Sequence, residues 1–184
     1  MSRLTIYRDD APQLAELDTT DEARIREALA RINVQFERWA ALRPSNSTDQ
    51  DADILAAYGP EIQRLERDRA FQSVDVLRCL PDHPQKEQLR AKFLSEHTHD
   101  DDEVRFFVEG AAMFYLHAAG RVHLVLCERN DLISVPAGMR HWFDMGPDPC
   151  FTVIRLFTTP EGWVARFTGD PIATRFPAFA RQAA

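Results

Sequence analysis

The amino-acid sequence predicts a mainly β fold with additional helices, a β-rich α+β domain whose strands form a sandwich or barrel. Between His97 and Phe157 nearly every segment is short and rich in β-forming residues, which is typical of such folds. The segments before residue 95 show helical spacing instead. At 184 residues the chain can bury one core. We therefore expect a single domain with helical and strand elaborations over 1–95, a strand-rich core over 96–167 and a loosely organised tail over 168–184.

The first expected helix begins at a capping box, because Thr19 and Glu22 stand three residues apart. Apolar residues at three- and four-residue spacing then run over 25–36 and indicate one buried stripe. Asn33 offers a second interpretation, since asparagine tolerates the left-handed conformation that ends many helices. Residues 34–39 also read as a strand. We favour a helix that ends at Asn33.

A second helical region spans 51 to about 69, and Gly59-Pro60 should divide it in two. We expect a strand over 73–80 and a short helix over 84–94 started by Asp82. The later expected strands are residues 103–109, 112–117, 121–128, 131–135, 141–144, 151–157 and 163–167.

Composition excludes several classes of protein. The net charge of -7 argues against a nucleic-acid partner, because phosphates would be repelled. No stretch approaches the roughly 20 apolar residues of a membrane span, and the N-terminus lacks the apolar run of a signal peptide. Cys79, Cys127 and Cys150 are odd in number and lack close pairing, which argues against a disulfide framework or structural zinc. We expect a cytoplasmic monomer without a membrane partner, in which Cys127 and Cys150 pack as small hydrophobes.

Three histidines and one carboxylate have the spacing of metal ligands on adjacent strands. His97 and His99 are two residues apart, so on a strand their side chains point to the same side. Glu103 follows an acidic turn, and His141 follows an apolar strand and a Pro-x-Gly turn. Imidazoles with one carboxylate and no thiolate suit a divalent iron, nickel, cobalt, manganese or zinc ion. His83, His117 and His123 are interpreted instead as surface or core histidines.

The order of these ligands carries a family resemblance. One stretch has the pattern H-x-H-x3-E-x6-G, and a later stretch has the pattern P-x-G-x-x-H. Together they resemble the paired motifs of the cupin superfamily. Within it, residues 96–110 are similar to the acireductone dioxygenase family, as are 130–138, 141–146 and 160–163. Ala91 and Met145 depart from the general cupin pattern, which has glycine and asparagine there. The resemblance implies a cupin-type β-barrel or jelly roll, in which 96–167 form the metal-binding core.

The resemblance also implies an activity. A divalent ion held by His97, His99, Glu103 and His141 would have two coordination positions left for the adjacent enediol oxygens of an acireductone. The ion would act as Lewis acid and template. The family cleaves 1,2-dihydroxy-5-(methylthio)pent-1-en-3-one with O2 in methionine salvage. One Fe²⁺ or Ni²⁺ per chain is expected: the iron form gives formate and 4-methylthio-2-oxobutanoate, and the nickel form gives 3-methylthiopropanoate, formate and carbon monoxide. The ligands do not discriminate between these ions.

Arg105 is the expected catalytic residue, because it shares a strand face with Glu103 and Phe107. A guanidinium beside the metal would stabilise an anionic substrate. The alternative is that Arg105 merely pairs with the acidic run 100–102. Arg155 is a second candidate whose direction is undecided, since residues 151–155 carry apolar side chains on both faces.

Further candidates depend on the resemblance. Glu96 and Asp102 flank the ligands, and one interpretation is that both are ordinary solvated carboxylates. The family resemblance implies instead that Glu96 supports metal incorporation and that Asp102 supports local conformational coupling. A pocket for the methylthio chain is one interpretation of four aromatic residues, and ordinary core is the other. These residues are Phe93, Phe107, Phe143 and Trp163.

Two other functions stay open at this point. A different metal-dependent cupin dioxygenase or isomerase would use the same ligands with another substrate. A non-enzymatic cupin that binds a sugar or small ligand is the other alternative, although no appended helix-turn-helix or second cupin repeat is visible in the sequence.

Overall fold

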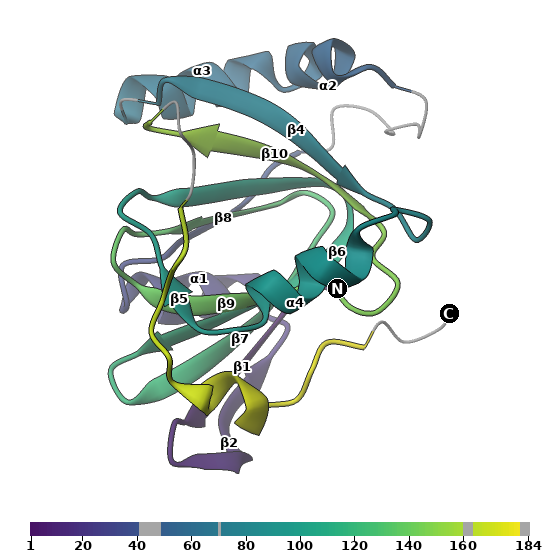
Figure 1. Ribbon diagram of the computed structural model, residues 1–184. Helices are drawn as coiled ribbons and strands as arrows, with labels where there is room; N and C mark the ends of the chain where they lie inside the picture. Colours follow the sequence, from purple (N-terminus) through teal and green to yellow (C-terminus); the bar gives the residue numbers. More distant parts are fainter. Residues whose placement is uncertain (41–48, 70, 160–163, 181–184) are drawn as a thin grey trace.

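The computed structural model describes residues 1–40, 49–69, 71–159 and 164–180. Strands make up most of the fold, and a few helices cover its outside (Figure 1). The helices are α1 (Glu22–Ala30), α2 (Asp51–Ala57), α3 (Gly59–Asp68), α4 (Lys86–Phe93) and the 3-10 helix η1 (Pro171–Arg175). The strands are β1 (Arg3–Arg8), β2 (Ala11–Thr19), β3 (Gln35–Arg38), β4 (Ser73–Cys79), β5 (His97–Thr98), β6 (Glu103–Ala118), β7 (Arg121–Glu128), β8 (Asp131–Val135), β9 (Arg140–Asp144), β10 (Phe151–Phe157) and β11 (Arg166–Phe167).

Two antiparallel layers share the long strand β6. The second half of β6 pairs with β7 and β9 in the layer β11-β5-β9-β6-β7-β1-β2, called here sheet A. The first half pairs with β8 and β10 in the layer β4-β10-β6-β8-β3, called sheet B. Figure 1 shows the two layers facing each other. The β-rich fold class predicted from the sequence is confirmed.

Gly110 lies at the point where β6 passes from one sheet to the other. Its φ of +79° is a conformation that side-chain-bearing residues rarely adopt, and an added Cβ would lie 1.9 Å from the carbonyl oxygen of Cys150. The sequence predicts two separate strands here, residues 103–109 and 112–117, with Gly110 after the first. That prediction was wrong, because the glycine bends a continuous strand rather than ending it.

The N-cap of the helix α1 lies two residues after the predicted cap. Asp21 is its N-cap, and the carboxylate accepts a hydrogen bond from the Arg24 backbone N–H. The Thr19 hydroxyl instead accepts from the Asp21 N–H, so the predicted capping box is wrong. The predicted break at Asn33 is confirmed: its φ is +61°, and β3 follows.

The remaining helices match the expected regions with one correction. Gly59 and Pro60 separate α2 from α3 as predicted, and Pro60 occupies the first turn of α3. The helix α4 exists, but its N-cap is Gln85 rather than the expected Asp82. Figure 1 shows α2 and α3 lying across the outer side of β4 and β10.

Strand pairing at the two ends of the chain was not predicted. The β1–β2 hairpin extends sheet A because β1 pairs with β7 over six residue pairs. The tail over 168–184, predicted to be loosely organised, instead contains η1 and buries Ile172, Phe176 and Phe179. The strand expected over 163–167 is reduced to Arg166–Phe167, and residue 163 lies outside the described residues.

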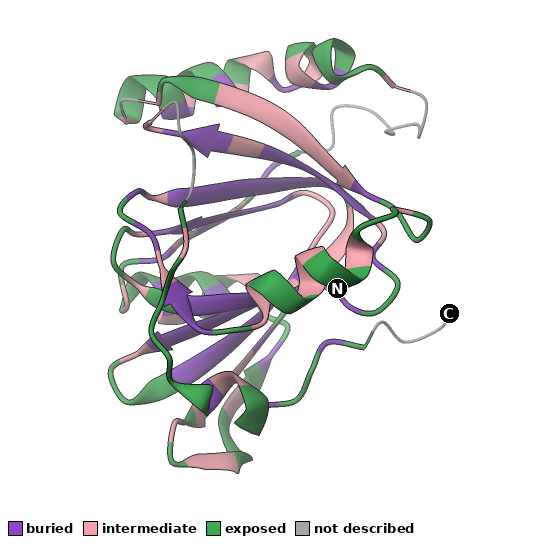
Figure 2. Ribbon diagram, in the orientation of Figure 1, coloured by how far each residue is buried: buried purple, intermediate pink, exposed green. Residues whose placement is uncertain are grey.

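Apolar side chains form one internal core and two outer clusters. The internal core lies between the sheets and includes Phe107, Phe114, Leu116 and Phe143. One outer cluster lies between sheet B and the pair α2–α3, and the other packs η1 and the tail against sheet A. The central strands are therefore buried on both faces (Figure 2). Among the described residues, no helix combines the length and apolar character needed to cross a membrane.

Candidate metal centre

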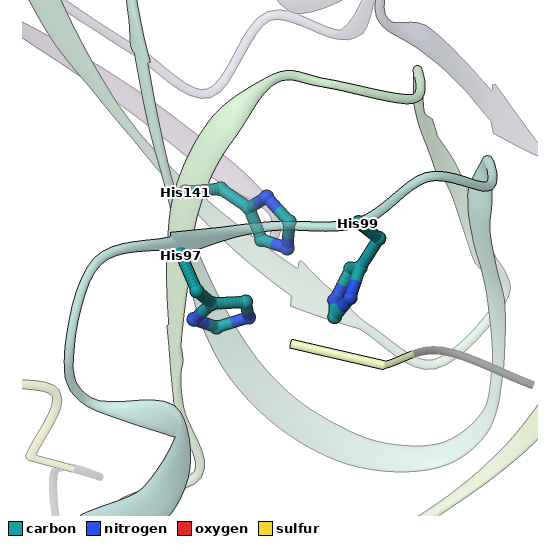
Figure 3. A group of neighbouring side chains, drawn as sticks. All are labelled: His97, His99 and His141. Carbon is teal, nitrogen blue, oxygen red and sulfur yellow. The ribbon is translucent and has the colours of Figure 1, made fainter. Parts of the chain in front are cut away.

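Three histidines converge at one end of the space between the sheets (Figure 3). His97 begins β5 and pairs directly with His141 of β9, so both imidazoles project from the same face of sheet A. His99 follows β5 two residues after His97. Each imidazole offers one nitrogen, and these three atoms lie within 4.8 Å of one another.

A backbone carbonyl lies at the Nδ1 atom of each of these histidines. The distances are 2.7 Å from His97 to Ser95 O, 3.1 Å from His99 to Val164 O and 2.8 Å from His141 to Met139 O. A carbonyl can only accept, so each Nδ1 carries the proton in the neutral ring. Each Nε2 then keeps its lone pair, as in metal-ligating histidines oriented by an outer hydrogen-bond partner.

Glu103 is buried at the same point. Its Oε2 lies 3.0 Å from His99 Nε2 and 3.1 Å from His141 Nε2, while Oε1 lies 2.7 Å from Arg105 Nε. Burial raises the pKa of this carboxyl group, but Arg105, His141 and His99 outweigh it and hold the pKa well below the usual range. The carboxylate therefore stays ionised in the metal-free protein.

The histidines differ in their response to burial. Burial, together with His141, lowers the pKa of His97 to about 4. Burial also acts on His99, but its hydrogen bond to Glu103 raises the pKa overall. A neutral imidazole is the form that binds a metal, and a nearby anion compensates the charge of a cation. The three imidazoles and the carboxylate of Glu103 therefore fit a divalent transition-metal ion.

A cavity of about 220 Å³ opens from this cluster into the space between the sheets. Phe93 and Phe143 are on its wall, as the pocket interpretation expected, and so are His99, Arg105 and Arg155. Lys92 and Ala165 also line the cavity. Five larger apolar or sulfur-bearing residues are on the same wall, none of which the sequence indicated as a pocket residue: Leu77, Cys79, Leu89, Met145 and Phe151. They lie on four separate elements or loops, so no local sequence pattern marks them as neighbours.

Phe107, which was expected to line the pocket, does not line this cavity. Phe107 is fully buried in the internal core, with its ring centroid 6.4 Å from that of Phe151. Its position matches the alternative interpretation as ordinary core. Trp163 lies outside the described residues.

Arg105 and Arg155 are directly opposite each other on β6 and β10, so their side chains share the inner face. Arg105 is 4% exposed, and its guanidinium lies 4.2 Å from the ring centroid of Phe143. Arg155 forms an ion pair with Asp75, with 2.8 Å between Nε and Oδ1. The alternative pairing of Arg105 with residues 100–102 is wrong, because Glu103 is its carboxylate partner.

The acidic turn before Glu103 connects three parts of the fold. Asp102 Oδ2 lies 2.7 Å from Arg69 Nη1, and its Oδ1 accepts from the Ala137 N–H at 2.9 Å. Asp101, which no sequence pattern distinguishes, is buried, and its carboxylate accepts from the backbone N–H of Thr158 at 2.9 Å. Asp100 is exposed and pairs with Arg166. Nothing in three successive aspartates distinguishes the buried one from the exposed one.

Glu96 is buried, but its carboxylate lies away from the three imidazoles. His97, His141 and Leu116 are successive partners across β5, β9 and β6, so their side chains share the inner face. Adjacent residues alternate faces, which places Glu96 and His117 on the outer face. The carboxylate of Glu96 meets His117 there, at 2.6 Å.

The similarities of the chain to known proteins agree with this geometry. The model of the ARD/ARD' family matches residues 3–165. Acireductone dioxygenase of Parvibaculum lavamentivorans is 57% identical over 97% of both chains, and that of Pseudomonas aeruginosa is 54% identical over 96% of this chain and 98% of its own. A solved structure of acireductone dioxygenase from Bacillus anthracis with a cadmium ion in its active centre superposes with a TM-score of 0.80. It is 30% identical and covers 91% of this chain and 98% of its own. With the family model matching nearly the whole described chain and relatives more than half identical, the chain belongs to the ARD/ARD' family.

Proposed function

We propose that this chain is a metal-dependent acireductone dioxygenase that cleaves 1,2-dihydroxy-5-(methylthio)pent-1-en-3-one with O2 in methionine salvage. The observation that carries the proposal is the convergence of three Nε2 atoms beside a buried carboxylate. Relatives that share more than half of the residues are named acireductone dioxygenases, which supports the substrate.

His97, His99, Glu103 and His141 would hold one ion per chain. The bound ion would supply Lewis acidity and a template for the neighbouring enediol oxygens. The carbonyls of Ser95, Val164 and Met139 keep the three rings in the tautomer and orientation required for binding. The ligand set would accept Fe²⁺ or Ni²⁺, and the relative with cadmium in its active centre supports a divalent metal here.

Arg105 would stabilise the anionic form of the substrate. Its guanidinium is buried next to Glu103 and faces the cavity, so its charge acts at low effective dielectric. Burial lowers the pKa of Arg105, yet an arginine starts so far above neutrality that the group stays charged. Arg155 adds a second guanidinium to the same wall. This pair would favour a substrate that has lost protons.

The apolar part of the cavity would receive the methylthio chain. Phe93 and Phe143 stand with Leu77, Leu89 and Met145 in a wall that offers packing and few polar partners. A volume of about 220 Å³ suits a short side chain better than a large one. Because Lys92, Arg105 and Arg155 line the same cavity, an acireductone with a positively charged side chain should be a poor substrate.

The decisive experiment is reconstitution of metal-free protein with Fe²⁺ or Ni²⁺ under anaerobic conditions, followed by acireductone and O2. We expect formate with 4-methylthio-2-oxobutanoate from the iron form, and 3-methylthiopropanoate, formate and carbon monoxide from the nickel form. Full metal occupancy without O2 uptake from either form would refute the assigned substrate and leave the metal site intact.

The cytoplasmic location and the monomeric state stay predictions. Light scattering of the purified chain tests the monomeric state.

A further inference from the structure

Four polar groups form a hydrogen-bonded chain on the outer face of sheet A, behind the three-histidine cluster; Glu96 and His117 are buried, Asp9 is half-buried and Thr168 is exposed. His117 donates from Nδ1 to Glu96 Oε1 at 2.6 Å, and the Thr168 hydroxyl donates to Glu96 Oε2 at 2.7 Å. On its other side, His117 Nε2 lies 3.3 Å from Asp9 Oδ2. We call Asp9, His117, Glu96 and Thr168 the Glu96 network. It joins the turn after β1, the strand β6, the residue before β5 and the C-terminal segment.

The position of Glu96 in the chain makes this network relevant to His97. The strand β5 is only two residues long, with one residue pair to β9 and two to β11. Few backbone contacts therefore determine its orientation. The Thr168 backbone N–H donates to the Glu96 carbonyl at 3.1 Å and adds a further restraint.

The same segment sets the ring of His97. His97 Nδ1 lies 2.7 Å from the carbonyl oxygen of Ser95, and Glu96 is the residue between the two. A rotation of the Glu96 backbone would move that carbonyl relative to the imidazole. The side chain of Glu96 is 1% exposed and fixed at both oxygens, so this rotation is opposed.

We propose that His117 and Thr168 are positioning residues that act through Glu96 to hold His97 in its ligating orientation. The proposal rests on the metal site described under Proposed function. It also assigns a different role to Glu96 from the support of metal incorporation that family resemblance implies. A carboxylate on the outer face, bound by His117 and Thr168, is not placed to pass an ion to imidazoles on the inner face.

Two nearly isosteric variants separate the contacts of His117. In His117→Asn the amide nitrogen takes the place of Nδ1 and keeps the donor to Glu96. In His117→Gln the amide reaches toward the Nε2 position near Asp9 and the donor to Glu96 is lost. The probe is Ni²⁺, with equilibrium affinity measured by competition with a chelator. We expect H117Q to weaken binding about 10–100-fold and H117N to stay within about threefold of the unchanged protein.

A second readout reports geometry independently of activity. With Co²⁺ bound, the visible absorption spectrum depends on the coordination geometry of the ion. H117Q should therefore change the spectrum, and H117N should keep the spectrum of the unchanged protein. His123→Gln is the matched control, because His123 is a buried histidine of the adjacent strand β7 whose Nδ1 lies near Leu116 O rather than Glu96. We expect H123Q to leave both readouts unchanged.

Several results would overturn the proposal. H117Q equal to the unchanged protein, or H123Q as damaging as H117Q, would remove the positioning role. Slower Ni²⁺ association in Glu96→Ala with unchanged affinity and Co²⁺ spectrum would favour metal capture instead. If neither His117 variant folds by circular dichroism, Thr168→Val carries the test, with a several-fold loss of Ni²⁺ affinity expected and no loss contradicting the proposal. Absence of Ni²⁺ binding to the unchanged protein would refute the proposed function itself.

Discussion

The two halves of β6 are almost equally buried, but they bury different chemistry. The first half places Glu103 and Arg105 on the inner face, next to the three-histidine cluster. The second half places Phe114 and Leu116 on the same inner face, in the apolar core. Both halves pair with strands on either side, so backbone hydrogen bonding does not distinguish them.

This difference separates stability from function within one strand. A buried ion pair loses hydration, and replacing such a pair with apolar residues is often neutral or stabilising. Burial of Leu116 and Phe114 removes apolar area from water and stabilises the fold directly. The charged side chains of the first half are therefore explained by their role in the site. The apolar second half stabilises the fold that positions the site.

The junction between the halves should give the largest effect on stability. In Gly110→Ala the new Cβ would lie 1.9 Å from the carbonyl oxygen of Cys150, at a φ of +79°. We expect a loss of more than about 4 kcal/mol in the free energy of unfolding, because both backbone strain and overlap must be relieved. Urea denaturation of the purified variant measures it, if the variant folds at all.

Gly120→Ala is the matched control for this junction. Its φ is +70°, but no heavy atom lies within 4 Å of an added Cβ. Conformational strain alone should cost about 1 kcal/mol. Equal losses of stability in the two variants would show that the close approach of Gly110 to the carbonyl oxygen of Cys150 does not restrain β6.

The apolar half should respond to a cavity. Leu116→Ala removes a fully buried side chain from the internal core and should lower the free energy of unfolding by about 2–5 kcal/mol. Because Leu116 offers no ligand atom, one metal ion per chain should still bind at 25 °C. Thermal unfolding and metal analysis of the same sample test both parts. Loss of metal at temperatures far below unfolding would mean that this half also determines the site.

Much of this comparison could be predicted from the sequence, since it rests on local patterns. The alternation of side chains placed Glu103 and Arg105 on one face, and the motif spacing selected the histidines. The separation at Gly59-Pro60 and the break at Asn33 between α1 and β3 also follow from local backbone preferences. In each case the outcome depends on residues close together in the sequence.

Other features depend on contacts between distant residues. The exposed strand β2 shows no hydrophobic alternation, and β1 is recognised as a strand through its pairing with β7, more than a hundred residues later. The direction of Arg155 was undecided because its strand is buried on both faces, and pairing with Arg105 determines it. The outer position of Glu96 likewise depends on the order of β5, β9 and β6. Propensity and spacing carry no information about such neighbours.

The ionic half should respond in metal affinity. In Glu103→Gln a neutral amide replaces the ionised carboxylate beside His99 and His141. We expect Ni²⁺ affinity to fall by more than about 100-fold, which exceeds the loss for an outer partner. Glu109→Gln is the control, because Glu109 is an exposed residue of the same half of β6. Equal affinities in the unchanged protein and E103Q would remove Glu103 from the ligand set.

The smallest expected effect concerns Arg105, whose replacement should change the pH dependence of turnover rather than the metal content. An opposite charge beside an acid lowers its pKa by about 1–3 units, so a substrate without this guanidinium should lose its proton at higher pH. In Arg105→Ala the acidic limb of kcat, which reports groups of the enzyme–substrate complex, should therefore shift upward by about one unit, and kcat on that limb should fall about tenfold. The control Arg140→Ala removes an exposed guanidinium from β9 and should leave the profile unchanged. A uniform loss of activity in R105A at every pH would indicate that Arg105 orients the substrate without affecting its ionisation, and the charge of the first half of β6 would then need a different explanation.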